Sequence, residues 1–235
     1  MLVCIMGPDG TGKTTLAKKM SEEIEDLEYI YFGGNKDQRK FVWFKEYLKK
    51  ERKGWLRTLF RYFLVFINDY AYFMQAKKKH MIADRSPIDK MIGSKMNGKK
   101  WRYIYHSIVL RLLPSPDLII LLDGDVDVIY ERKREISRDK ILEYWSLYKS
   151  YFTKRRLAYI VIDSTVNDVD QVAHLAIQEL EKVIYFAAYL VVSIDSKKRT
   201  KDLAELEEAV VAEVEIVNED FEEWEQKRIK QMDTE

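Results

Sequence analysis

The stretch from Gly7 to Thr15 reads GPDGTGKTT, and it constrains the fold more than any other part of the chain. It meets the P-loop pattern G-x-x-x-x-G-K-[ST] through Gly7, Gly12, Lys13 and Thr14. An apolar run at 2–6 precedes the stretch and is typical of a buried strand. The sequence after it has helical spacing and places four apolar residues on one face: Leu16, Met20, Ile24 and Leu27. A strand, a Gly-rich loop and a helix in this order favour a true P-loop over a tight turn that matches the pattern by chance.

The physical use of such a loop is anion binding. Its glycines let backbone N–H groups turn inward, and the helix that follows adds free N–H groups and a positive dipole end. Lys13 can reach the outer phosphates of a nucleoside triphosphate, and the Thr14 hydroxyl can bind Mg²⁺. We therefore expect the loop to bind a nucleoside triphosphate together with Mg²⁺. The loop residues predicted to contact the nucleotide are Gly7, Pro8, Asp9, Gly10, Thr11, Gly12, Lys13, Thr14 and Thr15.

Composition narrows the class of protein. The chain has 235 residues and a formal net charge of +1, so there is no overall electrostatic case for binding nucleic acid or a membrane. The single cysteine, Cys4, lies in the first expected strand, which excludes a disulfide framework and indicates a reducing compartment. We expect a cytoplasmic protein, because no signal peptide precedes the P-loop and the apolar run at 183–194 is too short to span a bilayer.

Strands and helices are expected to alternate along the chain. The pattern predicts strands at 29–34, 79–84, 118–123 and 157–163, and helices at 55–76, 101–113, 127–135, 141–156 and 168–182. Several strands are apolar throughout, which is typical of a parallel sheet covered on both faces. The fold class is therefore α/β, a P-loop NTPase three-layer sandwich with five parallel strands and helices on both faces. Ligands collect at the carboxyl ends of such strands, where the P-loop, Asp84–Arg85, Asp123 and Asp163–Thr165 are all expected.

Charge and pattern divide the chain further. Residues 36–111 are rich in Lys and Arg, which suits a polyanionic substrate, although most single lysines are better explained as a solvated helix face. Residues 187–195 are expected to form a strand or the end of a buried helix, and the pattern at 202–229 predicts an acidic helix. We expect a P-loop domain at 1–196 and an acidic helical extension at 197–235. The extension either stabilises the domain, pairs with a second subunit or covers an empty basic site.

Four segments together resemble one known family. They are GPDGTGKTT, then ADRSP, then PSPDLIILLDGDVDVIYERKRE, and then YIVIDS before a closing helix. Over residues 1–184 this order resembles the thymidylate kinase family, with the chain as a divergent member. The resemblance implies a five-stranded parallel sheet, transfer of the γ-phosphoryl group of ATP to the 5′-phosphate of dTMP with Mg²⁺, and a homodimer. Nucleic acid and membrane are not expected as partners.

The resemblance also implies roles for single residues. Lys13 would stabilise the transferring phosphoryl group, and Arg85 would bridge the donor and acceptor phosphates. Asp84 would lie beside the metal held by Thr14, and Asp9 would meet the acceptor sugar. The remaining roles are a flexible basic lid (Arg132, Arg134, Arg138), the adenine site (Ser164, Thr165) and stacking on the acceptor base (Phe66). Two alternatives stay open, that Arg85 is an ion-pair partner of Asp84 and that the lid arginines are a solvated helix face.

The chain departs from the family pattern at the acceptor. The family's R-E-P-G-G after the second strand is YFGGN here, so Arg39 is the substitute that we expect. Tyr70 stands where the family has a phosphate-binding arginine, and Ser86 follows Arg85 where an aromatic residue is usual. The triplet Asp84-Arg85-Ser86 is similar to one in deoxynucleoside kinases, but those need a carboxylate base after the second strand, and Asp37 is the sole nearby acid. A deoxynucleoside kinase, and a nucleotide-binding protein with weak or lost transfer, are the alternatives to a dTMP kinase.

Overall fold

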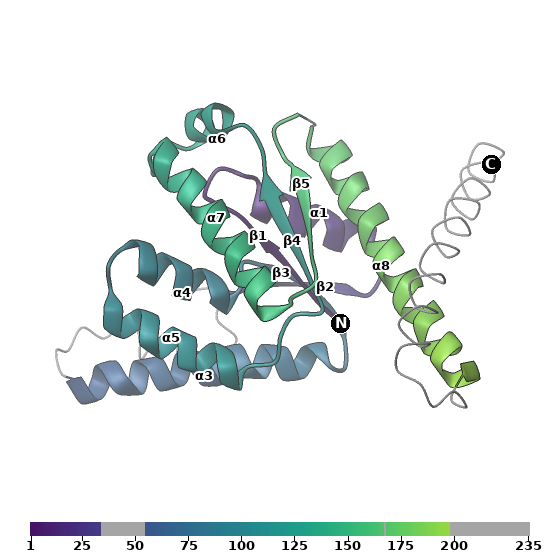
Figure 1. Cartoon of the computed structure of the whole chain (residues 1–235), viewed down its shortest axis with the longest axis horizontal. Helices are drawn as coiled ribbons and strands as arrows, with labels where there is room; N and C mark the ends of the chain where they lie inside the picture. Colours follow the sequence, from purple (N-terminus) through teal and green to yellow (C-terminus); the bar gives the residue numbers. More distant parts are fainter. Residues whose placement is uncertain (34–54, 167, 198–235) are drawn as a thin grey trace. The chain divides into compact units, whose positions relative to one another are not determined.

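The computed structural model describes residues 1–33, 55–166 and 168–197. Its sheet has five parallel strands in the order β2-β3-β1-β4-β5 (Figure 1). Their bounds are β1 Leu2–Met6, β2 Leu27–Tyr31, β3 His80–Asp84, β4 Leu118–Asp123 and β5 Tyr159–Asp163. The predicted α/β class and five-stranded parallel sheet are confirmed.

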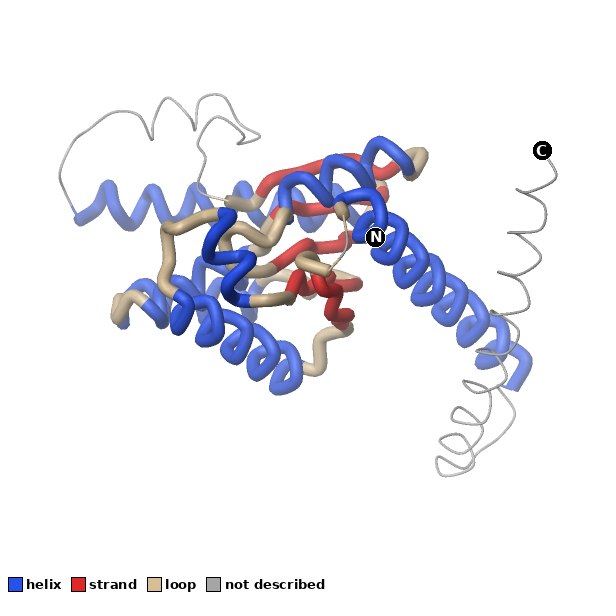
Figure 2. Tube along the Cα trace, turned by 90° about the horizontal axis from the view of Figure 1, so that it is seen from above, coloured by secondary structure: helices blue, strands red, loops and turns tan. Residues whose placement is uncertain are grey.

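Helices connect the strands and cover both faces of the sheet (Figures 1 and 2). Their bounds are α1 Lys13–Glu23, α3 Trp55–Ala76, α4 Pro87–Met96, α5 Lys100–Leu112, α6 Val126–Arg132, α7 Arg138–Arg155 and α8 Val169–Lys197. A parallel pair of strands needs a crossover connection, and helices supply it here. Every residue of β1 is buried, because the strand lies at the centre of the sheet with helices above and below.

Side chains alternate between two buried layers. Leu2, Cys4 and Met6 of β1 belong to one cluster with residues of α3, α4, α5 and α7. The intervening Val3 and Ile5 are equally buried and point to the other face, in keeping with the two-residue period of a strand. Cys4 is a buried free cysteine, as the sequence predicts for a small core residue.

The structure differs from the predicted elements at three places: the end of the first helix, an additional helix, and the end of the last helix. The first helix ends at Glu23, so Leu27 opens β2 instead of continuing the helical stripe; Asp26 takes a positive φ of 64° in the turn between them. Helix α4 was not predicted. Helix α8 continues past the predicted end at 182 to Lys197, so of the two alternatives for residues 187–195 the helix end agrees with the structure and the strand does not.

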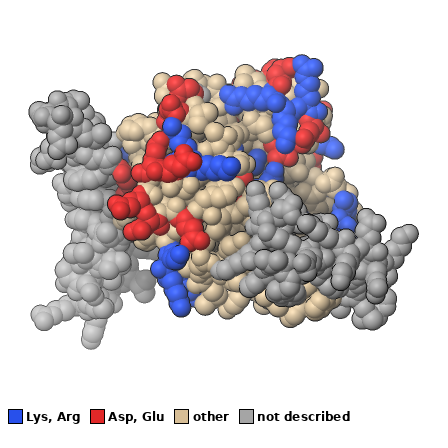
Figure 3. All heavy atoms as spheres, turned by 180° about the vertical axis from the view of Figure 1, so that it is seen from behind, with Lys and Arg blue, Asp and Glu red and all other residues tan. Residues whose placement is uncertain are grey.

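The chain divides into two compact units, Met1–Leu175 and a second that begins at Ala176, inside α8. The predicted acidic helix at 202–229 and the start of the basic region at 36–111 lie outside the described residues, and the predicted domain boundary at 196–197, at the last residues of α8, stays a prediction. No helix in the described part of the chain is both long enough and apolar enough to cross a membrane. On the face drawn in Figure 3, acidic and basic side chains are interspersed.

Candidate functional site

The P-loop joins the buried end of β1 to the start of α1. Gly12 precedes the helix with a φ of 84°, a left-handed conformation that glycine adopts without a steric penalty. Among the described residues no side chain caps the helix there, and the first turn of the helix carries no acidic residue. The N–H groups at the start of α1 are therefore not used by the protein's own carboxylates, which is the arrangement that anion binding requires.

Lys13 is folded back over this loop. Its Nζ donates to the carbonyl of Pro8 at 2.5 Å and lies 3.6 Å from Asp9 Oδ1, and the side chain is only 5% exposed. Burial, and then the neighbouring Arg85, lower the pKa of Lys13 to about 8, although Asp9 acts in the opposite direction. A phosphate group at the loop would therefore be a stronger anionic partner for the amine than Asp9 is.

Thr14 and Asp84 bring two hard oxygen ligands together. Thr14 Oγ1 donates to Asp84 Oδ2 at 2.5 Å across the gap between α1 and the end of β3. Asp84 is fully buried, and its Oδ1 has no hydrogen-bond partner among the described residues. A buried carboxylate oxygen left over beside a hydroxyl fits Mg²⁺, which takes few protein ligands and completes its shell with phosphates and water. In the described part of the chain no group of three or more His, Cys, Asp or Glu side chains could hold a metal alone, so phosphate oxygens would be needed.

Arg85 follows Asp84 and points to the P-loop. Its Nη2 forms an ion pair with Asp9 Oδ1, so its direct partner is the loop acid and not Asp84. Its backbone has a φ of 73°, a strained value for a residue with a side chain, and its N–H donates to Ile5 at 2.9 Å. Burial alone would raise the pKa of Asp9, but Arg85 and Lys13 outweigh it and hold that pKa below its ordinary value.

Beneath Arg85 lies a second carboxylate, Asp89. It completes a capping box at the start of α4: Ser86 N–H donates to Asp89 Oδ2 at 2.8 Å, and Ile88 N–H donates to Ser86 Oγ at 3.2 Å. The Tyr148 hydroxyl of α7 donates to the other oxygen. Burial raises the pKa of Asp89 although Arg85 opposes the rise, and Asp89 in turn helps to keep Arg85 charged. Sequence reasoning missed Asp89. The signal that could have found it is the capping-box pattern Ser86-Pro87-Ile88-Asp89, with Ser at the N-cap and an acid three residues later.

Helix α6 packs on the P-loop at Gly10. A Cβ at this glycine would lie 2.9 Å from the carbonyl of Ile129 and 3.3 Å from Lys133 Cβ, so no other residue fits without displacing α6. Lys133 lies close enough to Asp9 to lower the pKa of its carboxyl. Lys133 is therefore a candidate phosphate ligand that sequence reasoning missed, although it lies within the basic stretch at 132–138.

The predicted lid arginines do not join Lys13 and Arg85. Arg132 Nη1 donates to the carbonyl of Ser164 at 2.9 Å. Arg138 pairs with Asp127 and lies 4.1 Å from the centre of the Tyr130 ring. Both are exposed and engaged with α6 and its neighbours, and their predicted contact with a transferring phosphate stays a prediction.

Ser164 and Thr165 lie at the carboxyl end of β5, at the edge predicted for them. Ser164 Oγ donates to the carbonyl of Asp123 at 3.0 Å, and Thr165 Oγ1 accepts from the N–H of Asp125 at 2.9 Å. These bonds tie the loop after β5 to the loop after β4. The two side chains thus fix the shape of this part of the edge and leave the predicted adenine contact untested.

The predicted acceptor residues are only partly described. Phe66 of α3 is half-buried and packs against the core, and Tyr70 is 42% exposed, with 6.1 Å between the two ring centres. Arg39 lies outside the described residues. Asp69, which lies between Phe66 and Tyr70 in sequence, accepts a hydrogen bond from Lys90 Nζ at 2.5 Å, and this contact links α3 to α4.

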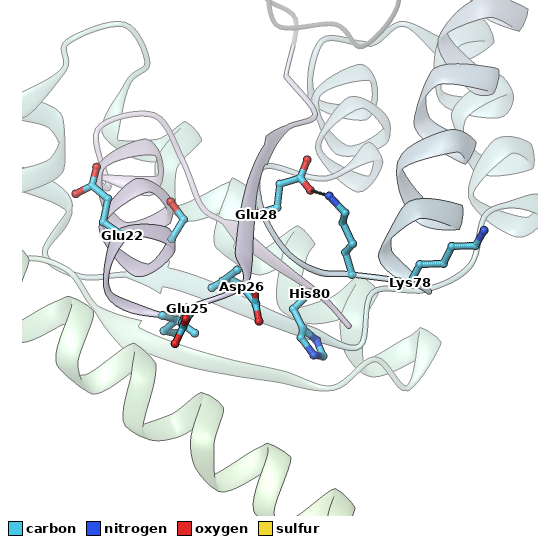
Figure 4. A pocket seen from close by; sticks show the side chains of 10 residues that line it. Glu22, Glu25, Asp26, Glu28, Lys78 and His80 are labelled. Atoms are coloured by element: carbon cyan, nitrogen blue, oxygen red, sulfur yellow. Dashed lines mark hydrogen bonds and ion pairs between the residues drawn. The ribbon is translucent and has the colours of Figure 1, made fainter.

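A cavity of about 630 Å³ lies at the opposite edge of the sheet, where β2 and β3 begin (Figure 4). Acidic residues from the end of α1 to the start of β2 line it together with Lys78, Lys79 and His80. Glu28 is already paired there with Lys79 at 3.0 Å. No P-loop residue lines this cavity. The candidate site therefore remains at the carboxyl ends of the strands.

Comparison with known sequences gives little. No family model matches the chain. Two curated proteins match at 51% identity over 39 residues, the DNA-directed RNA polymerase subunit beta′ of Salinispora tropica and that of Salinispora arenicola. The match takes in 17% of this chain and 3% of the polymerase subunit, so it assigns no function.

Comparison with solved structures is more informative about the fold. Two similar structures are of deoxyadenosine kinase from M. mycoides. One has the products dCMP and a flexible dCDP bound (19% identity, TM-score 0.52, 77% of this chain and 99% of that one). The other has bound dATP (23% identity, TM-score 0.50, 77% of this chain and 100% of that one). A third is thymidylate kinase from Candida albicans (19% identity, TM-score 0.56, 77% of this chain and 92% of that one). The chain has the fold of these kinases.

Proposed function

We propose that the chain is a Mg²⁺- and ATP-dependent nucleoside monophosphate kinase, with dTMP as its acceptor. The observation that carries the proposal is the meeting of Lys13, Thr14, Asp84 and Arg85 around an uncapped helix start. Phosphoryl transfer depends on positioning and charge neutralisation, and these are the groups that such a reaction needs. The fold shared with thymidylate and deoxyadenosine kinases supports it.

Each group has a part in the proposed reaction. The triphosphate would lie along residues 7–15, with the amine of Lys13 on its outer phosphates. The Thr14 hydroxyl and Asp84 carboxylate would hold Mg²⁺, which when bound neutralises phosphate charge. Arg85 and Lys133 would counter the repulsion between the two substrates' phosphates. Ser164 and Thr165 would face the adenine. The acceptor would be met by Arg39, Phe66 and Tyr70. Arg132 and Arg138 would have to leave their present partners to reach the phosphates.

The lowered pKa of Asp9 makes it unsuited to be the base that a nucleoside acceptor needs, and Asp37, the acid near the second strand, lies outside the described residues. A nucleoside hydroxyl must lose a proton to a base whose pKa lies near the working pH. The pKa of Asp9 is held below its ordinary value by Arg85 and Lys13, which makes it a poor base. A monophosphate is already ionised near neutral pH and needs no base. Asp9 is therefore better suited to bind the acceptor sugar, as the family resemblance suggests.

The test is ADP release from Mg²⁺-ATP with a panel of acceptors: dTMP, dCMP and dAMP against thymidine, deoxycytidine and deoxyadenosine. Lys13→Ala should lower turnover by a factor of about 100 or more, because it removes charge from the transition state. Lys18→Ala is the matched control, since Lys18 is an exposed lysine on the same helix. Turnover of nucleosides alone would establish the deoxynucleoside kinase instead. ATP binding without turnover of any acceptor would leave a nucleotide-binding protein.

A further inference from the structure

A second cavity, of about 280 Å³, lies between α4, α5 and α7, away from the P-loop. Four cationic side chains line it: Lys95, Arg111, Lys154 and Arg155. The buried apolar residues Met91 and Ile92 form part of its wall, beside the rings of Tyr103 and Tyr151. A cavity with an apolar wall and a few convergent polar groups is the usual form of a small-molecule site.

Within the described residues, no acidic side chain balances the charge of this cavity. No Asp or Glu lines it, and none of its four cations forms an ion pair within the described ranges of the chain. At the P-loop, by contrast, both Lys13 and Arg85 lie against Asp9. Each cation stands in the last turn of its helix, where the helix dipole favours positive charge. That preference explains each charge singly, but not why three helices bring theirs to one cavity.

The side chains are also directed at one another. Tyr103, Ser107 and Arg111 follow at four-residue spacing, so they share the face of α5 that lines the cavity. Burial raises the pKa of Tyr151, and Arg155 and Arg111 both oppose that rise, which places two guanidinium groups near one phenol. Guanidinium groups bind phosphate oxygens in pairs, and a tyrosine ring offers a surface for a second ring.

We infer that the cavity between α4, α5 and α7 binds a phosphate monoester with a compact body, independently of the nucleotide at the P-loop. The volume of about 280 Å³ lies just below the range of drug-sized sites, which suits a single ring and one phosphate better than a nucleoside triphosphate. Such a group can belong to a free metabolite or to a lipid headgroup. A lipid source deserves testing because Ile104, Ile108 and Leu112 form an exposed apolar stripe on α5 beside the cavity-lining residues.

The experiment titrates phenyl phosphate into the full chain saturated with ADP, so that the P-loop is filled, and follows binding by calorimetry. The variant Arg111→Gln/Arg155→Gln should weaken phenyl phosphate binding by about tenfold or more and leave ADP binding unchanged. Lys18→Gln/Lys77→Gln is the control, because it removes two charges from exposed lysines outside the cavity. Lys13→Ala should show the reverse pattern, with ADP binding lost and phenyl phosphate binding kept.

A second arm separates the two sources. Sedimentation with vesicles of phosphatidic acid in phosphatidylcholine is compared with phosphatidylcholine alone. Binding of phenyl phosphate without vesicle binding supports a free metabolite, and vesicle binding that Arg111→Gln/Arg155→Gln abolishes supports a lipid headgroup. Ser107→Phe fills the cavity without changing charge and replaces the double variant if that one does not fold. Binding of neither probe, or binding that the cavity variants leave intact, overturns the inference.

Discussion

Lys13 is a buried amine whose protonation depends on what occupies the loop around it. With only Asp9 and a backbone carbonyl as partners, its pKa is lowered to about 8. The phosphates of a bound nucleotide would add negative charge beside it and raise the pKa again. Nucleotide binding and proton binding at this residue should therefore be coupled.

The coupling predicts proton uptake. At about pH 8.5 most empty sites carry a neutral Lys13, so ATP binding should take up roughly 0.7 proton for each site. Calorimetry in two buffers of different ionisation enthalpy measures this number directly. Lys13→Arg keeps the positive charge at all accessible pH values, so its binding heat should not depend on the buffer. Equal heats for the unaltered chain in both buffers would contradict the lowered pKa.

Asp89 should stabilise the fold as well as orient Arg85. Asp89→Ala removes an acceptor for Ser86 N–H and leaves the buried Tyr148 hydroxyl unpaired, so we expect a loss of about 2–3 kcal/mol in the free energy of unfolding. Tyr148→Phe should cost about 1 kcal/mol. Urea unfolding of the two single variants and the double variant gives their coupling, and strictly additive losses would mean that the contact contributes nothing.

The sequence predicts the site where a motif contains the residues or where strand order brings motifs to one edge, as it does for Thr14 and Asp84. Lys13 and Thr14 follow from the loop pattern itself. The pairing of Arg85 with Asp9 could not be predicted, because it joins residues 76 positions apart and depends on how β1 and β3 pair. Lys133 was hidden for the same reason, since only packing of α6 against Gly10 brings it to the loop.

At the level of elements, the contact between α6 and the P-loop depends on Gly10. Gly10→Ala would put a Cβ within 2.9 Å of the Ile129 carbonyl, so α6 must move, and we expect nucleotide binding to weaken by about tenfold or more. Gly98→Ala is the matched control, because Gly98 also has a positive φ, 63°, but has no neighbour within 4 Å of the added Cβ. It should lower stability by about 1 kcal/mol and leave the dissociation constant of ATP unchanged. Equal effects of the two variants on ATP binding would mean that the packing of α6 does not position the P-loop.

Long periodic elements were predictable, and short or capped ones were not. The pattern predicts α3 and β4 with their observed bounds, since each has a continuous apolar period. Helix α4 has 10 residues and follows the N-cap Ser86. Its start is marked by a capping box with two side-chain hydrogen bonds, and less by an apolar stripe. The first helix stops early because the chain turns at Asp26, where a left-handed residue interrupts a pattern that would otherwise continue.

For the whole molecule, stability should fall as the solution becomes acidic. His106 is the buried one among the chain's three histidines. Burial, and then Lys90 and Arg102, lower its pKa from 6.5 to about 4. Between about pH 6.5 and pH 4, His106 therefore binds a proton in the unfolded chain but not in the folded chain. Its contribution to the free energy of unfolding is fully present above that window and is lost as the pH falls through it.

The loss should reach on the order of 2–3 kcal/mol at the acid end of the window. Urea unfolding at a series of pH values measures it. His106→Phe keeps an aromatic ring beside Tyr62 and Tyr105 but has no proton to bind, so its stability should change less over this range. His80→Gln, at an exposed position, is the control and should follow the unaltered chain. Parallel curves for all three would rule out His106 as the source.

The uncapped start of α1 has a consequence for the molecule as a whole. Among the described residues, the helix N–H groups at this start have no side-chain acceptor and one buried oxygen of Asp84 has no donor, so a ligand that satisfies these groups would stabilise the fold. Ligands that satisfy these groups shift the melting temperature upward, by the equivalent of about 2.7 kcal/mol at a hundred times the dissociation constant. Melting curves recorded with Mg²⁺-ADP and one candidate acceptor at a time would thus rank acceptors before any of them is turned over, with the protein's own heat resistance as the reporter.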